Sequence, residues 1–254
     1  MDVTAFLRSL GPLVEDRPLH GLAGRLLRRL RLASHDDPCR DIVGMASPKK
    51  LHLLRNAVSF LPLSPSECYL EVGTYQGKSL VAALLANPGR YAIACDNFSL
   101  FDEALAPKNK ATLERNLERY GLSSRVRFFD CDFRDLLPRW RTERLPPVGV
   151  YFYDGAHDEV SQYLAIRLAE DVLADQAVVI IDDWRYARDS QSFAEAGTRR
   201  ALADSSHQWK VEHVLPARYN GDLDQWWNGV AVLSFERRTT RTLTLSTEEP
   251  PGRH

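Results

Sequence analysis

Acidic side chains directly follow two apolar runs of this chain. Asp154 comes after the run VYFY at residues 150–153, and Asp182 and Asp183 come after AVVII at residues 177–181. If both runs are neighbouring strands of a parallel sheet, the three carboxylates lie together at its carboxyl edge. Carboxylates gathered in this way bind a hard divalent cation such as Mg²⁺. Any one of these acids alone is better explained as a helix cap or a solvent-facing residue, so the triplet is what favours a metal.

The stretch YLEVGTYQGKSL, residues 69–80, predicts a turn that binds a nucleotide-like ligand. An apolar strand ends at Glu71, and the chain turns through Gly73 and Gly77 into a helix. Glycines permit a tight turn and a close approach to the ligand, and the helix N-terminus directs free N–H groups to the same place. Three residues separate the glycines, whereas a phosphate-binding P-loop has four. Tyr75 replaces the second glycine of the dinucleotide fingerprint, so both of these motifs are disfavoured.

Two further acids follow predicted strands. Asp96 ends the run YAIAC, and Asp132 precedes Phe133 in RVRFFDCDF. An acid after a strand is often only a helix N-cap. In nucleotide-binding α/β folds, however, an acid at the end of the second strand binds the ribose hydroxyls. Acids at the ends of successive strands therefore favour a ligand that extends along this edge of the sheet.

The combination E-x-G-x-x-x-G resembles motif I of class I S-adenosylmethionine-dependent methyltransferases. The resemblance implies that Asp96 binds the ribose, that Asp132 lies near the adenine amino group, and that Phe133 packs on the adenine ring. It implies a binding site for S-adenosylmethionine that comprises Glu71, Gly73, Thr74, Tyr75, Gly77, Ser79, Asp96, Asp132, Phe133 and Asp154.

The later acids resemble those of metal-dependent O-methyltransferases of the catechol type and of the macrolide and aminocoumarin sugar O-methyltransferases. In the catechol type, an Asp after the fourth strand and an Asp-Asn pair after the fifth hold the metal. Those positions are Asp154, Asp182 and Asp183 here, with Asp in place of Asn as in the sugar-modifying relatives. His157 stands where the catechol enzymes have a general-base Lys, and the D-G-x-H form is similar to a broad group of bacterial small-molecule methyltransferases. The resemblance covers about residues 50–235.

His157 and Asp154 are the predicted catalytic residues, and His157 has two interpretations. A neutral imidazole would take the proton of an acceptor hydroxyl, because its pKa lies near working pH. Alternatively, His157 is an N-terminal helix residue or an orienting partner of Asp154. Aromatic residues in nearby loops are expected to line an acceptor pocket, although core packing explains each of them as well; these are Trp184, Tyr186, Trp226 and Trp227.

Alternating strand and helix patterns predict an α/β fold from residue 51 onwards. We expect a Rossmann-like, doubly wound, mostly parallel seven-stranded sheet with a C-terminal antiparallel hairpin and an N-terminal helical cap. The predicted strands are residues 68–72, 91–95, 125–129, 148–153, 176–181, 208–214 and 229–235. The predicted helices are residues 51–61, 77–87, 108–120, 133–140 and 158–174.

The fold pattern divides the chain into three parts. A cap or lid is expected at residues 1–50, the S-adenosylmethionine-binding domain at 51–238, and a disordered tail at 239–254. The cap contains a basic helix with leucines at helical spacing, which either packs on the domain or binds a membrane surface or a partner. These leucines are Leu22, Leu26, Leu27 and Leu30.

Composition limits the classes of function. The 254 residues have a formal net charge of −1, so bulk electrostatics do not favour nucleic acid. The sequence contains no run of about 18 apolar residues, so no membrane span is expected, and its first residues do not resemble a secretory signal. The four cysteines form no C-x-x-C pair, which favours a reduced, cytoplasmic protein without a structural zinc. A leucine-rich cap helix would suit a homodimer.

These observations favour an enzyme that transfers a methyl group from S-adenosylmethionine to a hydroxyl of a small molecule, such as a sugar, a phenol or a natural-product intermediate. Mg²⁺ or another divalent cation is expected to assist. Two alternatives stay open: a metal-free N-, O- or C-methyltransferase, and a non-catalytic nucleotide-binding partner subunit of the same fold.

Overall fold

The computed structural model describes residues 1–14, 39–63, 66–100, 102–185 and 192–238. The predicted basic helix around Leu22–Leu30, the pocket candidate Tyr186 and the predicted tail at 239–254 lie outside the described residues.

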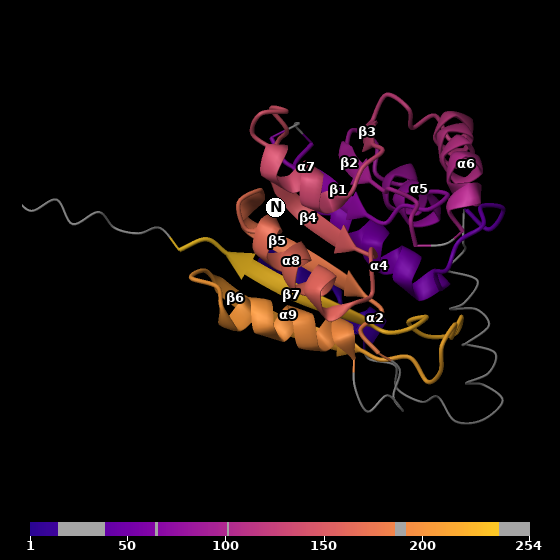
Figure 1. The fold of residues 1–254 in the computed structure, drawn as a ribbon. Coiled ribbons are helices and arrows are strands. Elements are labelled where there is room, and N and C mark those ends of the chain that lie inside the picture. Colours follow the sequence, from indigo (N-terminus) through magenta and orange to yellow (C-terminus); the bar gives the residue numbers. More distant parts are fainter. Residues whose placement is uncertain (15–38, 64–65, 101, 186–191, 239–254) are drawn as a thin grey trace, which may run out of the picture.

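The strands form one seven-stranded sheet in the order β3-β2-β1-β4-β5-β7-β6 (Figure 1). The strands β1 (Cys68–Val72), β2 (Ala92–Cys95), β3 (Val126–Phe129), β4 (Val148–Tyr153) and β5 (Leu173–Asp182) pair in parallel. The last two strands, β6 (Gln208–Leu215) and β7 (Val230–Glu236), form an antiparallel hairpin, and β7 pairs antiparallel with β5. The predicted fold class is therefore confirmed.

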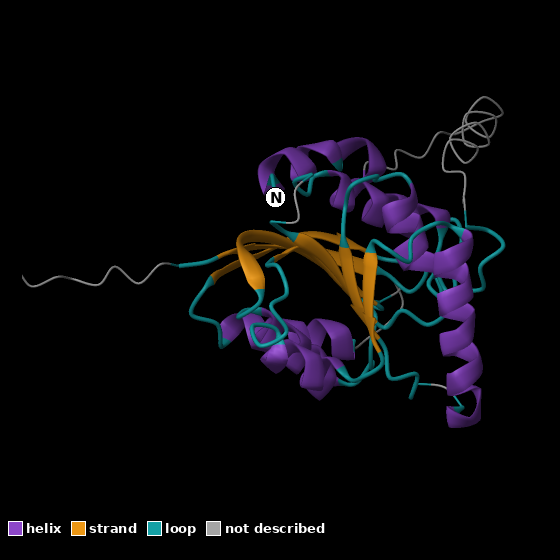
Figure 2. Cartoon of the chain, turned by 90° about the horizontal axis from the view of Figure 1, so that it is seen from above, coloured by secondary structure: helices purple, strands orange, loops and turns teal. Residues whose placement is uncertain are grey.

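Helices cover both faces of the sheet (Figure 2). Side chains that alternate along each strand point to opposite faces: Tyr69 of β1 joins one core cluster, whereas Leu70 joins the other. The first cluster includes residues of α1 (Val3–Ser9), α4 (Pro48–Ser59), α5 (Lys78–Leu85) and α6 (Ala106–Arg119). The second includes residues of α7 (Phe133–Leu136), α8 (Glu159–Ala169) and α9 (Phe193–Ala203). Shorter elements are α2 (Gly11–Val14), η1 (Glu103–Leu105) and η2 (Leu137–Arg139).

The first residues of the chain pack on the sheet. Phe6 and Leu10 are fully buried in the first core cluster, and the Phe6 ring lies edge-on to Phe60 with 5.9 Å between centroids. The helix predicted at 51–61 begins earlier, at Pro48, because the Ser47 side chain caps it by accepting from the Lys50 N–H. The expected boundary after residue 50 therefore falls inside α4. Across the described residues, no helix is both long and apolar enough to cross a bilayer.

Helix α9 was not predicted from the sequence, because Gly197 and Thr198 interrupt its apolar pattern. The structure explains the glycine: a Cβ at Gly197 would lie 2.4 Å from the Glu159 carbonyl oxygen, so only glycine lets α9 pack this closely on α8. The S-x-x-E pattern at residues 192–195 could have predicted the start of this helix, since Ser192 caps it by accepting from the Glu195 N–H.

Candidate functional site

The turn after β1 is in direct backbone contact with the end of β4. Gly73 has a φ of +85°, and a Cβ there would lie 1.9 Å from the carbonyl oxygen of Asp154. The Asp154 N–H donates to the Val72 carbonyl at 2.9 Å. This contact requires glycine both for the backbone conformation and for the space, and it fixes Asp154 beside the predicted ligand-binding turn.

Asp96, at the end of β2, connects two loops through its carboxylate. Its Oδ2 accepts from the Tyr75 N–H and its Oδ1 from the Phe98 N–H, each at 2.7 Å. Burial raises the pKa of Asp96, although these hydrogen bonds act in the opposite direction. The predicted ribose-binding acid therefore also holds the turn after β1 against the loop after β2.

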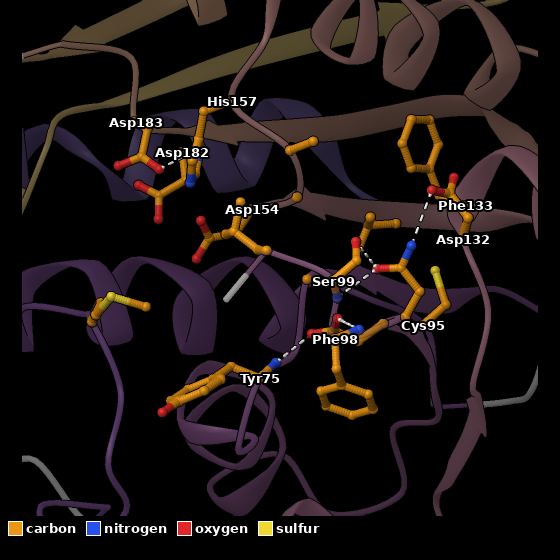
Figure 3. A pocket seen from close by; sticks show the side chains of 18 of the residues that line it. Tyr75, Cys95, Phe98, Ser99, Asp132, Phe133, Asp154, His157, Asp182 and Asp183 are labelled. Carbon is orange, nitrogen blue, oxygen red and sulfur yellow. Dashed lines mark hydrogen bonds and ion pairs between the residues drawn. The ribbon is translucent and has the colours of Figure 1, made fainter. Parts of the chain in front are cut away.

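A pocket of about 560 Å³ opens at the carboxyl edge of the parallel strands (Figure 3). Acids of the predicted metal site lie at one end of it, and Asp132 and Phe133 lie at the other, with Tyr75 and Phe98 along the lower side of the view. Nine of the residues predicted to bind the donor or the metal or to act in catalysis line this pocket: Gly73, Tyr75, Asp96, Asp132, Phe133, Asp154, His157, Asp182 and Asp183.

Four other predicted cofactor residues, Glu71, Thr74, Gly77 and Ser79, are not among the residues that line the pocket. Glu71 is fully buried, and its carboxylate accepts from the Tyr69 hydroxyl at 2.5 Å and from the Ser79 hydroxyl at 2.7 Å. Burial raises the pKa of Glu71 to about 7. The Thr74 hydroxyl is buried and has no hydrogen-bond partner among the described residues. Gly77 begins α5 with a φ of +87°.

Asp132 is the N-cap of α7, which is the simpler of the two interpretations of an acid that follows a strand. Its Oδ1 accepts from the Arg134 N–H at 2.8 Å, and the Arg134 guanidinium donates to both carboxylate oxygens. The hydrogen bonds from Arg134 lower the pKa of Asp132. Asn97 also donates to Asp132, at 3.3 Å. Phe133 is buried against Tyr153, with 5.4 Å between ring centroids.

The predicted metal ligands converge at the other end of the pocket. Asp154, Asp182 and Asp183 each offer a carboxylate oxygen, and these oxygens lie within 4.8 Å of one another. Asp183 adopts a left-handed backbone conformation (φ 50°), which aspartate tolerates better than most residues and which turns the chain out of β5. Burial and the charge of Asp182 raise the pKa of Asp154 well above its usual range.

His157 lies beside this cluster and is oriented by it. Its Nδ1 lies 2.9 Å from Asp183 Oδ2, and the side chain remains 45% exposed. The hydrogen bond to Asp183 raises the pKa of His157, although burial opposes the shift. The Asn228 side chain donates to the other oxygen of Asp183 at 2.7 Å. His157 and Asn228 therefore fix the Asp183 carboxylate from two sides.

Lys50 is a member of the site that sequence analysis missed. Its side chain is fully buried in the first turn of α4 and pairs with Asp182 Oδ2, and its Nζ also lies 3.3 Å from the Met45 carbonyl. Although burial lowers the pKa of Lys50, the charges of Asp182, Asp154 and Asp183 raise it overall. Asp182 Oδ1 is buried without a hydrogen-bond partner among the described residues.

The long distance along the chain explains why Lys50 and Asn228 were missed. Lys50 precedes its partner Asp182 by 132 residues and stands next to a second lysine at the start of a helix. No local sequence pattern therefore identifies it as a residue of the site. Asn228 follows the two tryptophans that sequence analysis did single out. Of the candidate aromatic residues, Trp227 lines the pocket, whereas Trp184 is fully buried in the core and Trp226 is buried with Lys49 over its ring.

Comparison with protein-family models adds an independent observation. Residues 70–184, which include the turn after β1 and all three clustered acids, match a model described as a methyltransferase domain. This segment of the chain is therefore similar to a methyltransferase domain. The match confirms the expected resemblance to methyltransferases. Among curated proteins, this chain has no match.

Solved structures share the fold of this chain at low sequence identity. The O-methyltransferase of Bacillus cereus, in complex with SAH, is 16% identical, with a TM-score of 0.55 over 90% of this chain and 97% of that one. TomG, an O-methyltransferase of Streptomyces achromogenes in complex with SAM, is 15% identical, with a TM-score of 0.55 over 94% and 100%. Cofactor-bound Rv0187 from MTB is 24% identical, with a TM-score of 0.54 over 94% and 97%.

Buried Glu71 predicts a pH dependence of stability that the Glu71→Gln variant lacks. The pKa of Glu71 is about 7 in the folded protein, whereas its ordinary value is 4.5. The free energy by which Glu71 stabilises the fold is therefore fully present below pH 4.5 and is lost as the pH rises through about 7. The free energy of unfolding of the wild type should therefore fall relative to Glu71→Gln, by on the order of 3 kcal/mol, between pH 4.5 and 8. Urea unfolding across this range measures the difference. A difference that stays constant with pH would contradict the burial of an ionisable Glu71.

Proposed function

We propose that this protein transfers the methyl group of S-adenosylmethionine to a hydroxyl oxygen of a small molecule with the help of a divalent cation. The observation that carries the proposal is the convergence of Asp154, Asp182 and Asp183 at one end of a pocket whose other end contains Asp132 and Phe133. A donor that extends along this pocket would bring its methyl group toward the acids and His157. The solved O-methyltransferases with SAM or SAH support this choice of donor.

The donor would be held mainly by residues at the ends of the first three strands. Asp96 would bind the ribose hydroxyls, since its carboxylate lines the pocket and its two oxygens have lone pairs beyond those that accept from the Tyr75 and Phe98 N–H groups. Phe133 would pack on the adenine ring near Asp132. Gly73 would allow close approach of the methionine part. Glu71, Thr74, Gly77 and Ser79 would support this turn from behind the pocket wall.

The carboxylate cluster fits a hard divalent cation such as Mg²⁺. All the converging donors are carboxylate oxygens, which such cations prefer. Asp182 Oδ1 is buried without a partner among the described residues, and a buried carboxylate oxygen without a partner is costly. Asp154, Asp182 and Asp183 would hold the cation, which when bound would lower the pKa of an acceptor hydroxyl.

His157 would act as the general base. Its Nδ1 faces Asp183, so a neutral ring that donates from Nδ1 keeps the Nε2 lone pair for the acceptor. In the reaction, the hydroxyl proton moves to Nε2, the oxygen forms a bond to the methyl carbon, and the carbon–sulfur bond breaks to leave the neutral thioether. Because the sulfonium is already a good electrophile, the main tasks of the protein are alignment and deprotonation.

One observation favours the alternative of a metal-free methyltransferase. The positive charge of Lys50 already pairs with Asp182, so the negative charge of the cluster is partly compensated without a metal.

The acceptor would be a small molecule that enters past Trp227 and Met45. A homodimer and a cytoplasmic location stay predictions.

Removal of divalent cations should abolish turnover. Assays with S-adenosylmethionine and a panel of phenol and sugar acceptors, in chelator and after addition of Mg²⁺ or Mn²⁺, measure this. Asp182→Ala should lose at least about 100-fold in turnover, because a metal ligand and its charge are removed. Asp175→Ala is the matched control, since Asp175 is an exposed acid near the other end of β5. Unchanged turnover in chelator, or a wild-type rate for Asp182→Ala, would refute the metal.

Replacement of His157 should affect proton transfer and not donor binding. His157→Ala is expected to lower kcat by about 10²–10⁴-fold and to remove the loss of rate at acidic pH, because the group that must be unprotonated is gone. Calorimetry should give an unchanged Kd for S-adenosylmethionine. His213→Ala on β6, away from the pocket, serves as the control. If His157→Ala retained its rate across the pH range, the base would have to be another group.

A further inference from the structure

Lys50 is the only lysine with a fully buried side chain among the described residues. Its position is unfavourable in two ways. Burial removes the ammonium group from water, and the first turn of a helix, where Lys50 stands, repels positive charge. The surrounding carboxylates must offset both costs, and Asp182 does so by direct contact.

Lys50 acts on the pocket through Asp182 and not by direct contact. The lysine is not among the residues that line the pocket, whereas Asp182 is. One oxygen of Asp182 is engaged by the ammonium group, and the other is buried without a partner within the described part of the chain. The same carboxylate therefore has an internal cation on one side and an open position on the other.

The charges of the cluster are balanced in a way that depends on Lys50. Three carboxylates lie within 4.8 Å of one another. With all of them ionised, the ammonium group of Lys50 reduces the excess negative charge by one third. A divalent cation bound to the same carboxylates would be repelled by Lys50, since two positive charges a few ångströms apart interact strongly at a poorly solvated site.

We propose that Lys50 is an internal counter-ion of the carboxylate cluster, which holds Asp182 in place when no metal is bound and competes with a divalent cation for it. The inference rests on the proposed cation site. It has two consequences: the fold does not depend on metal, and the affinity for a divalent cation is lower than three carboxylates alone would give. Lys50 is thus a positioning residue that keeps metal binding reversible.

The test compares Lys50→Met with the wild type and with Lys49→Met. Lys49 is the preceding residue of the same helix turn, but its side chain donates to Gln225 and stacks on Trp226. Calorimetry with Mn²⁺ alone and thermal unfolding with and without Mn²⁺ are the measurements. We expect Lys50→Met to bind Mn²⁺ at least about tenfold more tightly than the wild type. Its unfolding temperature should be lower without Mn²⁺ and should rise more when Mn²⁺ is added. Lys49→Met should match the wild type in Mn²⁺ affinity and in the rise of its unfolding temperature on addition of Mn²⁺.

The outcomes separate this inference from the metal hypothesis. If the wild type binds Mn²⁺ and Lys50→Met binds it equally or more weakly, the counter-ion role is wrong and the cation site stands. If only Lys50→Met binds Mn²⁺, the counter-ion role stands and the wild type works without metal. If neither binds, both proposals fail. Should Lys50→Met not fold alone, Mn²⁺ must restore folding to it or to Lys50→Gln, and failure to rescue both variants would overturn the inference.

Discussion

Carboxylates repel one another when they are withdrawn from water, and the structure holds three of them with oxygens within 4.8 Å. The other polar groups nearby are arranged around this repulsion. Lys50 lies against Asp182, and His157 and Asn228 donate to the two oxygens of Asp183. Burial and the charge of Asp182 raise the pKa of Asp154. These partners offset part of the repulsion among the acids, and the proposed cation would offset the rest.

The sheet topology explains why these acids meet. Strands β1, β4 and β5 are neighbours and parallel, so the residues that follow them lie at one edge. The contact between Gly73 and the Asp154 carbonyl brings the first turn onto the fourth strand, and Asp96 connects that turn to the loop after β2. The proposed donor-binding and metal-binding residues therefore share one backbone frame, which suits a reaction that depends on alignment.

Periodicity and strand-end acids were sufficient to predict the sheet and the acids that line the pocket. Each of those signals is local: an apolar run, the acid that follows it, and the glycines at Gly73 and Gly77. Lys50 and Asn228 could not be predicted, because their partners are distant in the chain and their residue types have many ordinary roles. Glu71, which was predicted to contact the donor, lies outside the pocket lining, and its carboxylate accepts from Tyr69 and Ser79. Helix α9 was missed because its packing requires a glycine that weakens the helical pattern.

The central claim is that one pocket at the carboxyl edge of the sheet binds both the donor and a divalent cation. A crystal structure of the full chain with SAH and Mn²⁺, with anomalous data for manganese, tests it most directly. The account predicts SAH with its adenine near Phe133 and its sulfur toward the acids, and a manganese peak within bonding distance of Asp154, Asp182 and Asp183. SAH outside this pocket, or a fully formed SAH complex with no manganese at the three acids, would contradict it.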